Sequence, residues 1–209
     1  MSTGWQCLCD MKKILDENNQ EFFLAYGTLL GCVRNNDFIP YDNDIDIGIF
    51  YDNFDINIIN KIKESKLFRV ASQCGDIENG FEITFIHTNN VPIDIFIYYK
   101  IKDNYYYCTS FDEKIYFEKG NYCTVWGQCY KWGHTIKGLI SFPFKSSHFL
   151  IPSNFEEYLE ESYGKDWKIP KSFSYEQGIV NNYYKNLINK DTNPEISELF
   201  KRDRELINE

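Results

Sequence analysis

The sequence lacks three features that would define its class at once. It has no run of about 18 apolar residues, the length that a helix needs to cross a membrane. Its first twenty residues include Asp10, Asp16 and Glu17, which interrupt any apolar leader. It also lacks excess positive charge, because 22 Lys and Arg stand against 31 Asp and Glu, giving a net charge of −9. We therefore expect a cytoplasmic protein without a membrane span or a nucleic-acid partner.

Cys-x-x-Cys pairs are also missing. The seven cysteines form an odd number, so disulfides cannot join all of them, and a reducing compartment is favoured. Cys123, Cys129, His134 and His148 have the chemistry of zinc ligands, but their spacing matches no standard zinc pattern. Buried free thiols are the other interpretation of these cysteines.

Apolar and aromatic residues, in contrast, are abundant. Hydrophobic residues make up 43% of the chain and aromatic residues 18%, which excludes a disordered protein. The 209 residues contain neither an internal repeat nor a long linker. We expect one domain over residues 1–209, with a core at 20–170 and C-terminal helices at 171–209.

The hydrophobic periodicity predicts a mixture of helices and strands. Helices are expected at residues 5–20, 28–34, 54–65 and 153–163, the last one opened by a capping box of Ser153 and Glu156. Strands are expected at 22–26, 44–49, 67–71, 81–87, 91–99, 104–110 and 114–118, the last two as a hairpin. Residues 119–150 predict irregular structure with short strands, and those beyond Pro170 predict polar helix. The fold class is α/β or α+β, with a mixed sheet flanked by helices.

Three acids, Asp42, Asp44 and Asp46, occupy alternate positions, and the last two alternate with isoleucines of the predicted strand. Like charges on one face of a strand are unfavourable unless a positive charge neutralises them. Asp94 lies in a second isoleucine-rich strand, VPIDIFIYY. Carboxylates at this density suit a pair of Mg²⁺ or Mn²⁺ ions of the kind that catalyse phosphoryl transfer. We therefore interpret Asp44, Asp46 and Asp94 as metal-binding catalytic residues.

A calcium-binding loop is the obvious alternative for the run DNDID. An EF-hand that starts at Asp42 needs glycine at its sixth position and glutamate at its twelfth. This sequence has Ile47 and Asn53 at those positions, which excludes the EF-hand.

Residues upstream of the acids have the chemistry of a phosphate site. Gly27 and Thr28 precede a predicted helix and offer backbone N–H groups and a hydroxyl, although an ordinary turn and N-cap would look the same. Arg34 could bind a phosphate with two hydrogen bonds or lie on the surface. Asp42 could bind substrate or orient a ligand, or it could cap the turn after Pro40.

The segment YGTLLGCVRNNDFIPYDNDIDIGI resembles the signature of the LicD/fukutin-related family. VPIDIFIYY is similar to the later Asp-Ile-Phe strand of that family, and IPSNFEEYLEESYGKDWKIP to its C-terminal stretch. The resemblance implies a nucleotidyltransferase-type fold with Gly27, Thr28, Asp44, Asp46 and Asp94 in the site. It also implies transfer of a phosphorylated alcohol, such as phosphocholine or ribitol phosphate, from a CDP-linked donor to a glycan hydroxyl. The family usually has an acid where Asn43 stands, so no role is assigned to that position.

Two other functions fit parts of the pattern. A nucleotide-sugar glycosyltransferase also uses Asp-x-Asp to hold a metal on a diphosphate, but it gives no reason for the Gly-Thr turn or for Asp94. A non-catalytic binder of glycan or nucleotide could keep the same fold. The metal-dependent transferase explains all of these features together, and it is the function we expect.

Overall fold

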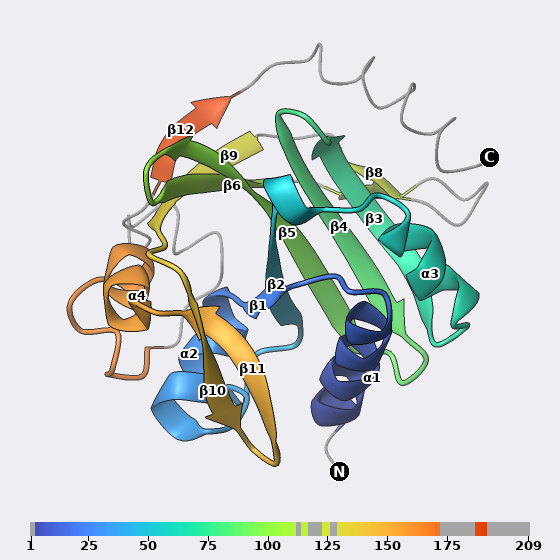
Figure 1. Ribbon diagram of the computed structural model, residues 1–209, viewed down its shortest axis with the longest axis horizontal. Helices are drawn as coiled ribbons and strands as arrows, with labels where there is room; N and C mark the ends of the chain where they lie inside the picture. Colours follow the sequence, from blue (N-terminus) through green and yellow to red (C-terminus); the bar gives the residue numbers. More distant parts are fainter. Residues whose placement is uncertain (1–2, 112–113, 117–122, 126–128, 172–186, 192–209) are drawn as a thin grey trace.

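The computed structural model describes residues 3–111, 114–116, 123–125, 129–171 and 187–191. They form a mixed sheet of ten strands, flanking helices and a separate hairpin (Figure 1), which confirms the predicted α+β class. The helices are α1 (Thr3–Glu17), α2 (Tyr26–Asn35), η1 (Tyr51–Asn53), α3 (Ile58–Glu64) and α4 (Phe155–Tyr163). The sheet contains β1 (Phe23–Leu24), β2 (Ile45–Phe50), β3 (Phe68–Asp76), β4 (Gly80–His87), β5 (Pro92–Lys102), β6 (Tyr105–Phe111), β7 (Lys114–Tyr116), β8 (Cys123–Val125), β9 (Cys129–Thr135) and β12 (Leu187–Asp191). The hairpin consists of β10 (Leu139–Phe144) and β11 (Ser147–Pro152).

The order of strands places β5 at the centre of the sheet. The path runs β12-β9-β6-β5-β4-β3-β8-β7, and β2 pairs with both β1 and β5. The β2–β5 and β3–β8 pairs are parallel, whereas the other pairs are antiparallel. Because β2 and β5 run in the same direction and in register, residues far apart in the sequence become direct neighbours across them.

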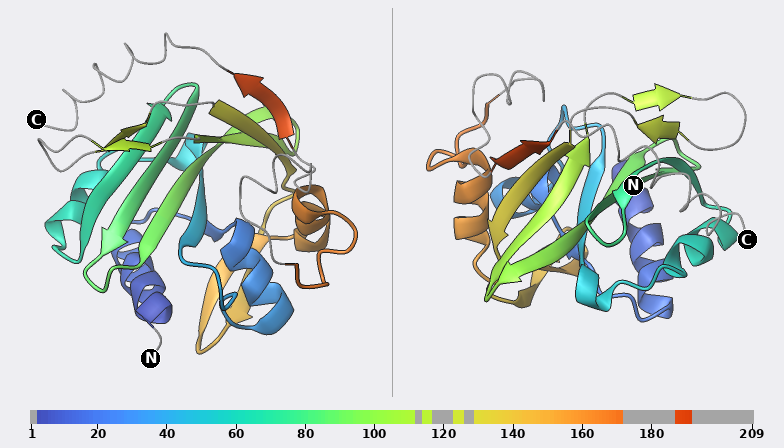
Figure 2. Two further views of the ribbon diagram at one scale, coloured as in Figure 1. Left: turned by 180° about the vertical axis from the view of Figure 1, so that it is seen from behind. Right: turned by 90° about the horizontal axis from the view of Figure 1, so that it is seen from above.

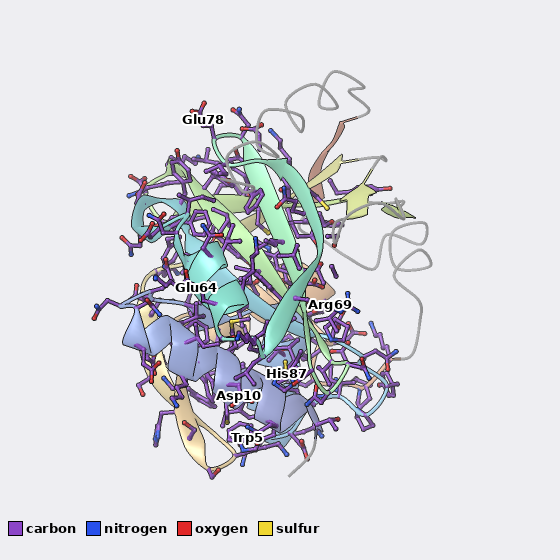
Figure 3. All side chains as sticks on the ribbon, turned by 90° about the vertical axis from the view of Figure 1, so that its right-hand side faces the viewer. Trp5, Asp10, Glu64, Arg69, Glu78 and His87 are labelled. Carbon is purple, nitrogen blue, oxygen red and sulfur yellow. The ribbon has the colours of Figure 1, made fainter. Side chains whose placement is uncertain are left out.

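Helices α1 and α3 lie together on one side of the central strands, as a comparison of Figures 1 and 2 shows. The face of α1 toward the core buries Leu8, Met11 and Leu15, and α3 buries its isoleucines. A polar contact also joins α1 to the sheet: the Nε2 atom of His87 in β4 lies 3.1 Å from a carboxylate oxygen of Asp10 (Figure 3). None of the helices in the described residues is long and apolar enough to cross a membrane.

Most of the predicted elements are present with shifted ends. The first helix, the acid-bearing strand and the isoleucine-rich strand at 91–99 are confirmed as α1, β2 and β5. The helix predicted at 54–65 is shorter and begins only at Ile58. Within residues 119–150, for which the sequence predicts irregular structure with short strands, the described residues contain β8, β9, β10 and most of β11.

Four local predictions are wrong, each for a tertiary reason. The strand expected at 22–26 stops at Leu24, because Tyr26 already begins α2. The expected β6–β7 hairpin does not form, because β6 pairs with β5 and β9 while β7 pairs with β8. Asn154, not Ser153, is the N-cap of α4, and its side chain bonds backbone groups of Thr135 and Lys137. Residues 187–191, expected to be helical, form β12 against β9; the rest of the predicted C-terminal helices lies outside the described residues.

Candidate active site

The carboxylates of Asp42, Asp44 and Asp46 lie close together where the chain enters β2. One oxygen from each lies within 4.8 Å of the others. Asp46 belongs to β2, Asp44 directly precedes the strand, and the backbone N–H of Asp42 closes the turn after Pro40 by donating to the carbonyl of Ile39. The backbone of Asp42 thus closes the turn while its side chain joins the acidic cluster, and its role toward substrate or ligand stays a prediction.

Asp94 reaches this cluster through the parallel pairing of β2 with β5. It is the direct partner of Asp46 in the register, so the two side chains project from the same face of the sheet. Both are buried, with 9% and 8% of their surfaces exposed. The hydroxyl of Thr84, which is the partner of Asp94 on β4, donates a short hydrogen bond to Asp94 Oδ1. The orientation of the Asp94 carboxylate is thereby fixed from the neighbouring strand.

The first turn of α2 holds Asp46 from the other side. The N–H of Gly27 donates to Asp46 Oδ2 over 3.0 Å, and the hydroxyl of Thr28 accepts the N–H of Asp46 over 2.8 Å. A side chain at Gly27 would displace the Asp42 carboxylate, because a Cβ atom there would lie 2.2 Å from Asp42 Oδ2. The Gly-Thr pair therefore supports the acids directly. A phosphate that used the Gly27 N–H would have to replace its bond to Asp46.

Burial, together with the neighbouring negative charges, raises the pKa of two of these acids. Burial raises the pKa of Asp42 to about 7, with further contributions from the charge of Asp44 and a hydrogen bond to it. Burial raises the pKa of Asp46 well above its ordinary value, and the charges of Asp44, Asp42 and Asp94 add to this effect. Both shifts favour the protonated acids. A divalent cation among them would reverse this preference, because it favours the ionised carboxylates.

Two other predicted groups are not brought into the cluster. Arg34 lies in the last turn of α2, roughly 10 Å along the helix axis from Gly27, and its Nε donates to Asn35. The two histidines among the candidate zinc ligands lie in different environments, because His134 is fully buried in β9 and His148 is exposed on β11. The side chains of Cys123 and Cys129 lie outside the described residues. Among the described cysteines, which are all free thiols, Cys7, Cys32, Cys74 and Cys108 are buried and Cys9 is half-buried.

Sequence reasoning missed two residues that support the site, Thr84 and Tyr26. Thr84 lies in the strand predicted at residues 81–87. Its proximity to Asp94, however, depends on the pairing of β4 with β5. The hydroxyl of Tyr26, the residue before Gly27, lies 2.8 Å from Cys108 Sγ and 3.0 Å from His134 Nε2. Both partners come from strands beyond the acidic motif, so no local pattern could identify these contacts.

Comparisons with known proteins identify relatives for most of the described chain. The family described as LicD/FKTN/FKRP, nucleotidyltransferase domain, matches residues 19–154. The chain is 30% identical over 158 residues to the ribitol-5-phosphate transferase FKTN of Mus musculus, covering 76% of this chain and 32% of that protein. It is 22% identical over 157 residues to the ribitol 5-phosphate transferase FKRP of Homo sapiens, covering 72% and 29%. The chain thus spans about a third of the length of these curated relatives.

Proposed function

Since the chain belongs to the LicD/FKTN/FKRP nucleotidyltransferase-domain family, we propose that it is a metal-dependent transferase of a phosphorylated alcohol. The donor is a CDP-linked alcohol, such as CDP-ribitol or CDP-choline, and the acceptor is a hydroxyl of a glycan or glycoconjugate. The names of the FKTN and FKRP relatives support ribitol phosphate as the first group to test.

The observation that carries this proposal is the cluster of Asp42, Asp44 and Asp46, with Asp94 paired beside Asp46 on β5. The donor set consists of carboxylate oxygens only, which suits Mg²⁺ or Mn²⁺ better than zinc. Burial and the neighbouring carboxylates raise the pKa of Asp42 and Asp46, and a divalent cation among the acids would offset both effects. The residues therefore fit a divalent metal centre.

Each residue has a defined part in the proposed reaction. Asp44 and Asp46 would hold the metal, which when bound would neutralise charge on the donor diphosphate. The acceptor oxygen forms a bond to the phosphorus that carries the alcohol, and the bond from that phosphorus to CMP breaks. The Asp94 carboxylate, oriented by Thr84, helps to remove the proton of the acceptor hydroxyl. Gly27 and Thr28 keep Asp46 in place, and Arg34 could reach phosphate oxygens only from the far end of α2.

The test is release of CMP from CDP-ribitol, CDP-choline and CDP-glycerol in the presence of Mg²⁺ or Mn²⁺. Wild type is compared with Asp44→Asn, which removes a charge from the cluster and preserves the volume of the side chain. The exposed Asp52→Asn is the control, because it removes the same charge outside the cluster. We expect turnover of one donor in wild type and Asp52→Asn, and its loss in Asp44→Asn. Equal turnover in all three proteins would refute the assignment of the acids.

Product analysis separates the proposed reaction from its alternatives. A phosphodiester formed together with CMP identifies transfer of a phosphorylated alcohol, whereas a glycosidic bond would identify a glycosyltransferase. Donor binding that requires metal but gives no product with any acceptor would identify a binding protein. Isothermal titration of each CDP-linked donor, with and without Mg²⁺, provides that measurement.

A further inference from the structure

Tyr26, the first residue of α2, has a backbone φ of 38°. This left-handed region is unfavourable for a residue with a large side chain. In the described part of the chain, the other non-glycine residues with positive φ are Asn, Asp or Lys in turns and bends: Asn19, Asn36, Lys66, Asn90, Asp103 and Lys145. Tyr26 differs from them because it is aromatic and lies within a helix. Its conformation therefore requires support from the surrounding structure.

That support comes from the side chain of Tyr26 and from a hydrogen bond between its backbone and the Tyr158 hydroxyl. The Tyr26 hydroxyl lies within hydrogen-bonding distance of both Cys108 in β6 and His134 in β9, which are fully buried. Its ring meets Phe96 of β5 edge-on, with 5.1 Å between the ring centres. The His134 ring stacks in turn on Tyr158 of α4, with 4.3 Å between centres. Three strands and a helix thus hold the side chain in one orientation.

The backbone on the other side of Tyr26 leads directly into the acidic site. The next N–H, that of Gly27, is the one that donates to Asp46, and Asp42 Oδ2 occupies the space where a Cβ atom on Gly27 would lie. The direction of this N–H depends on the rotation of the peptide that joins Tyr26 to Gly27. A change in the backbone of Tyr26 would therefore move both contacts together.

We propose that Tyr26 is a positioning residue whose anchored hydroxyl keeps the backbone left-handed and so directs the Gly27 N–H at Asp46. The inference rests on the proposed function only in the claim that the acids bind metal. Without the hydroxyl, the backbone relaxes toward negative φ, the bond from Gly27 to Asp46 weakens, and Asp42 and Asp46 lose their fixed orientation. Groups that orient metal ligands typically change metal affinity by about 10–100-fold when they are removed.

The experiment compares Tyr26→Phe with Tyr99→Phe. Each substitution removes one hydrogen-bonded hydroxyl, but the Tyr99 hydroxyl donates over 2.7 Å to the carbonyl of Ile77, in the turn between β3 and β4. The first measurement is the ¹H–¹⁵N chemical shift of the Gly27 amide in metal-free protein. The second is the dissociation constant of Mn²⁺. We expect Tyr26→Phe to move the Gly27 amide and to weaken Mn²⁺ binding about tenfold, and Tyr99→Phe to leave affinity within about twofold of wild type.

The two measurements also separate this inference from the proposed function. If wild type does not bind Mn²⁺, the proposed metal centre fails, while the Gly27 amide shift still decides whether Tyr26 positions the turn. An unmoved amide in Tyr26→Phe, or equal effects of both substitutions, would overturn the inference. If Tyr26→Phe does not fold, Cys108→Ala and Cys108→Ser replace it. Serine keeps a partner for the Tyr26 hydroxyl, so only alanine should move the Gly27 amide.

Discussion

Adding a single methyl group at Gly27 should disable the acidic site and leave the fold in place. A Cβ atom there would lie 2.2 Å from Asp42 Oδ2 and 3.2 Å from Asp46 Oδ2, whereas ordinary contacts begin at 3.4 Å. The Asp42 carboxylate must then move by at least about 1.2 Å, the difference between 2.2 and 3.4 Å. Metal sites keep their ligand distances within about 0.2 Å. A displacement of this size should weaken metal binding and turnover by about 100-fold.

The effect of Gly27→Ala on stability has two opposing parts. Overpacking costs about 1–3 kcal/mol, while alanine in place of glycine within a helix contributes up to about 1 kcal/mol. We therefore expect the free energy of unfolding to fall by about 0–3 kcal/mol. Asp42→Ala removes the carboxylate that the methyl group meets. In that background Gly27→Ala should be neutral or stabilising, so the two substitutions should be coupled by about 1–3 kcal/mol.

Mn²⁺ titration and urea denaturation of wild type, the two single variants and the double variant provide the assay. Gly4→Ala is the matched control, because Gly4 lies in the first turn of α1 and a Cβ atom there meets Phe38 at an ordinary 3.6 Å. Gly4→Ala should bind Mn²⁺ as wild type does. The reasoning is refuted if Gly27→Ala also binds Mn²⁺ within about twofold of wild type, or if its effect on stability is the same with and without the Asp42 carboxylate.

Three further predictions concern Asp42, His134 and Thr84. Because burial raises the pKa of Asp42 to about 7, metal-free protein should lose stability as pH rises from about 4 to 7. Asp42→Asn should reduce that loss in urea denaturation, and an unchanged slope would contradict the pKa shift. Burial lowers the pKa of His134 from 6.5 to about 3. The neutral His134 side chain therefore contributes fully to the free energy of unfolding above pH 6.5, and this contribution is lost as pH falls toward 3. The stability difference between wild type and His134→Phe should therefore shrink by about 2 kcal/mol between pH 7.5 and 5, and a constant difference would exclude a neutral buried His134. Thr84→Val, which removes the hydroxyl bound to Asp94, should lower kcat about tenfold with little change in KM. Thr84→Ser should restore kcat, whereas equal losses in both variants would indicate a packing role.

The sequence predicts local features of the site better than it predicts their assembly. Alternation of acids with isoleucines is sufficient to place Asp44 and Asp46 on one face, because the side-chain period of a strand is fixed. The same pattern identifies Asp94, but its position opposite Asp46 depends on the register of two strands that are not consecutive. Strand pairing between distant segments leaves no local signal. For that reason the bond from Thr84 to Asp94 could not be predicted.

The same distinction explains the errors in the fold. The strand predicted through Tyr26 follows aromatic and apolar composition, which cannot reveal a left-handed backbone held by Cys108 and His134. The expected pairing of β6 with β7 assumes that neighbouring strands form a hairpin. The structure instead places β5 and β9 on the two edges of β6, which leaves no edge for β7. In each case a tertiary contact overrides a reasonable local preference.

The parallel pairing of β2 with β5 has a consequence for the order of folding. Asp46 and Asp94 are 48 positions apart, and a contact over that separation requires closure of a long loop. The antiparallel contacts of β3 with β4 and of β4 with β5 lie within that loop and involve much shorter separations. We expect these local pairs to form first and β2 to join them afterwards. The acids would then meet only after β3, β4 and β5 have paired, so the appearance of a Mn²⁺-binding signal during refolding would mark the docking of β2 onto β5.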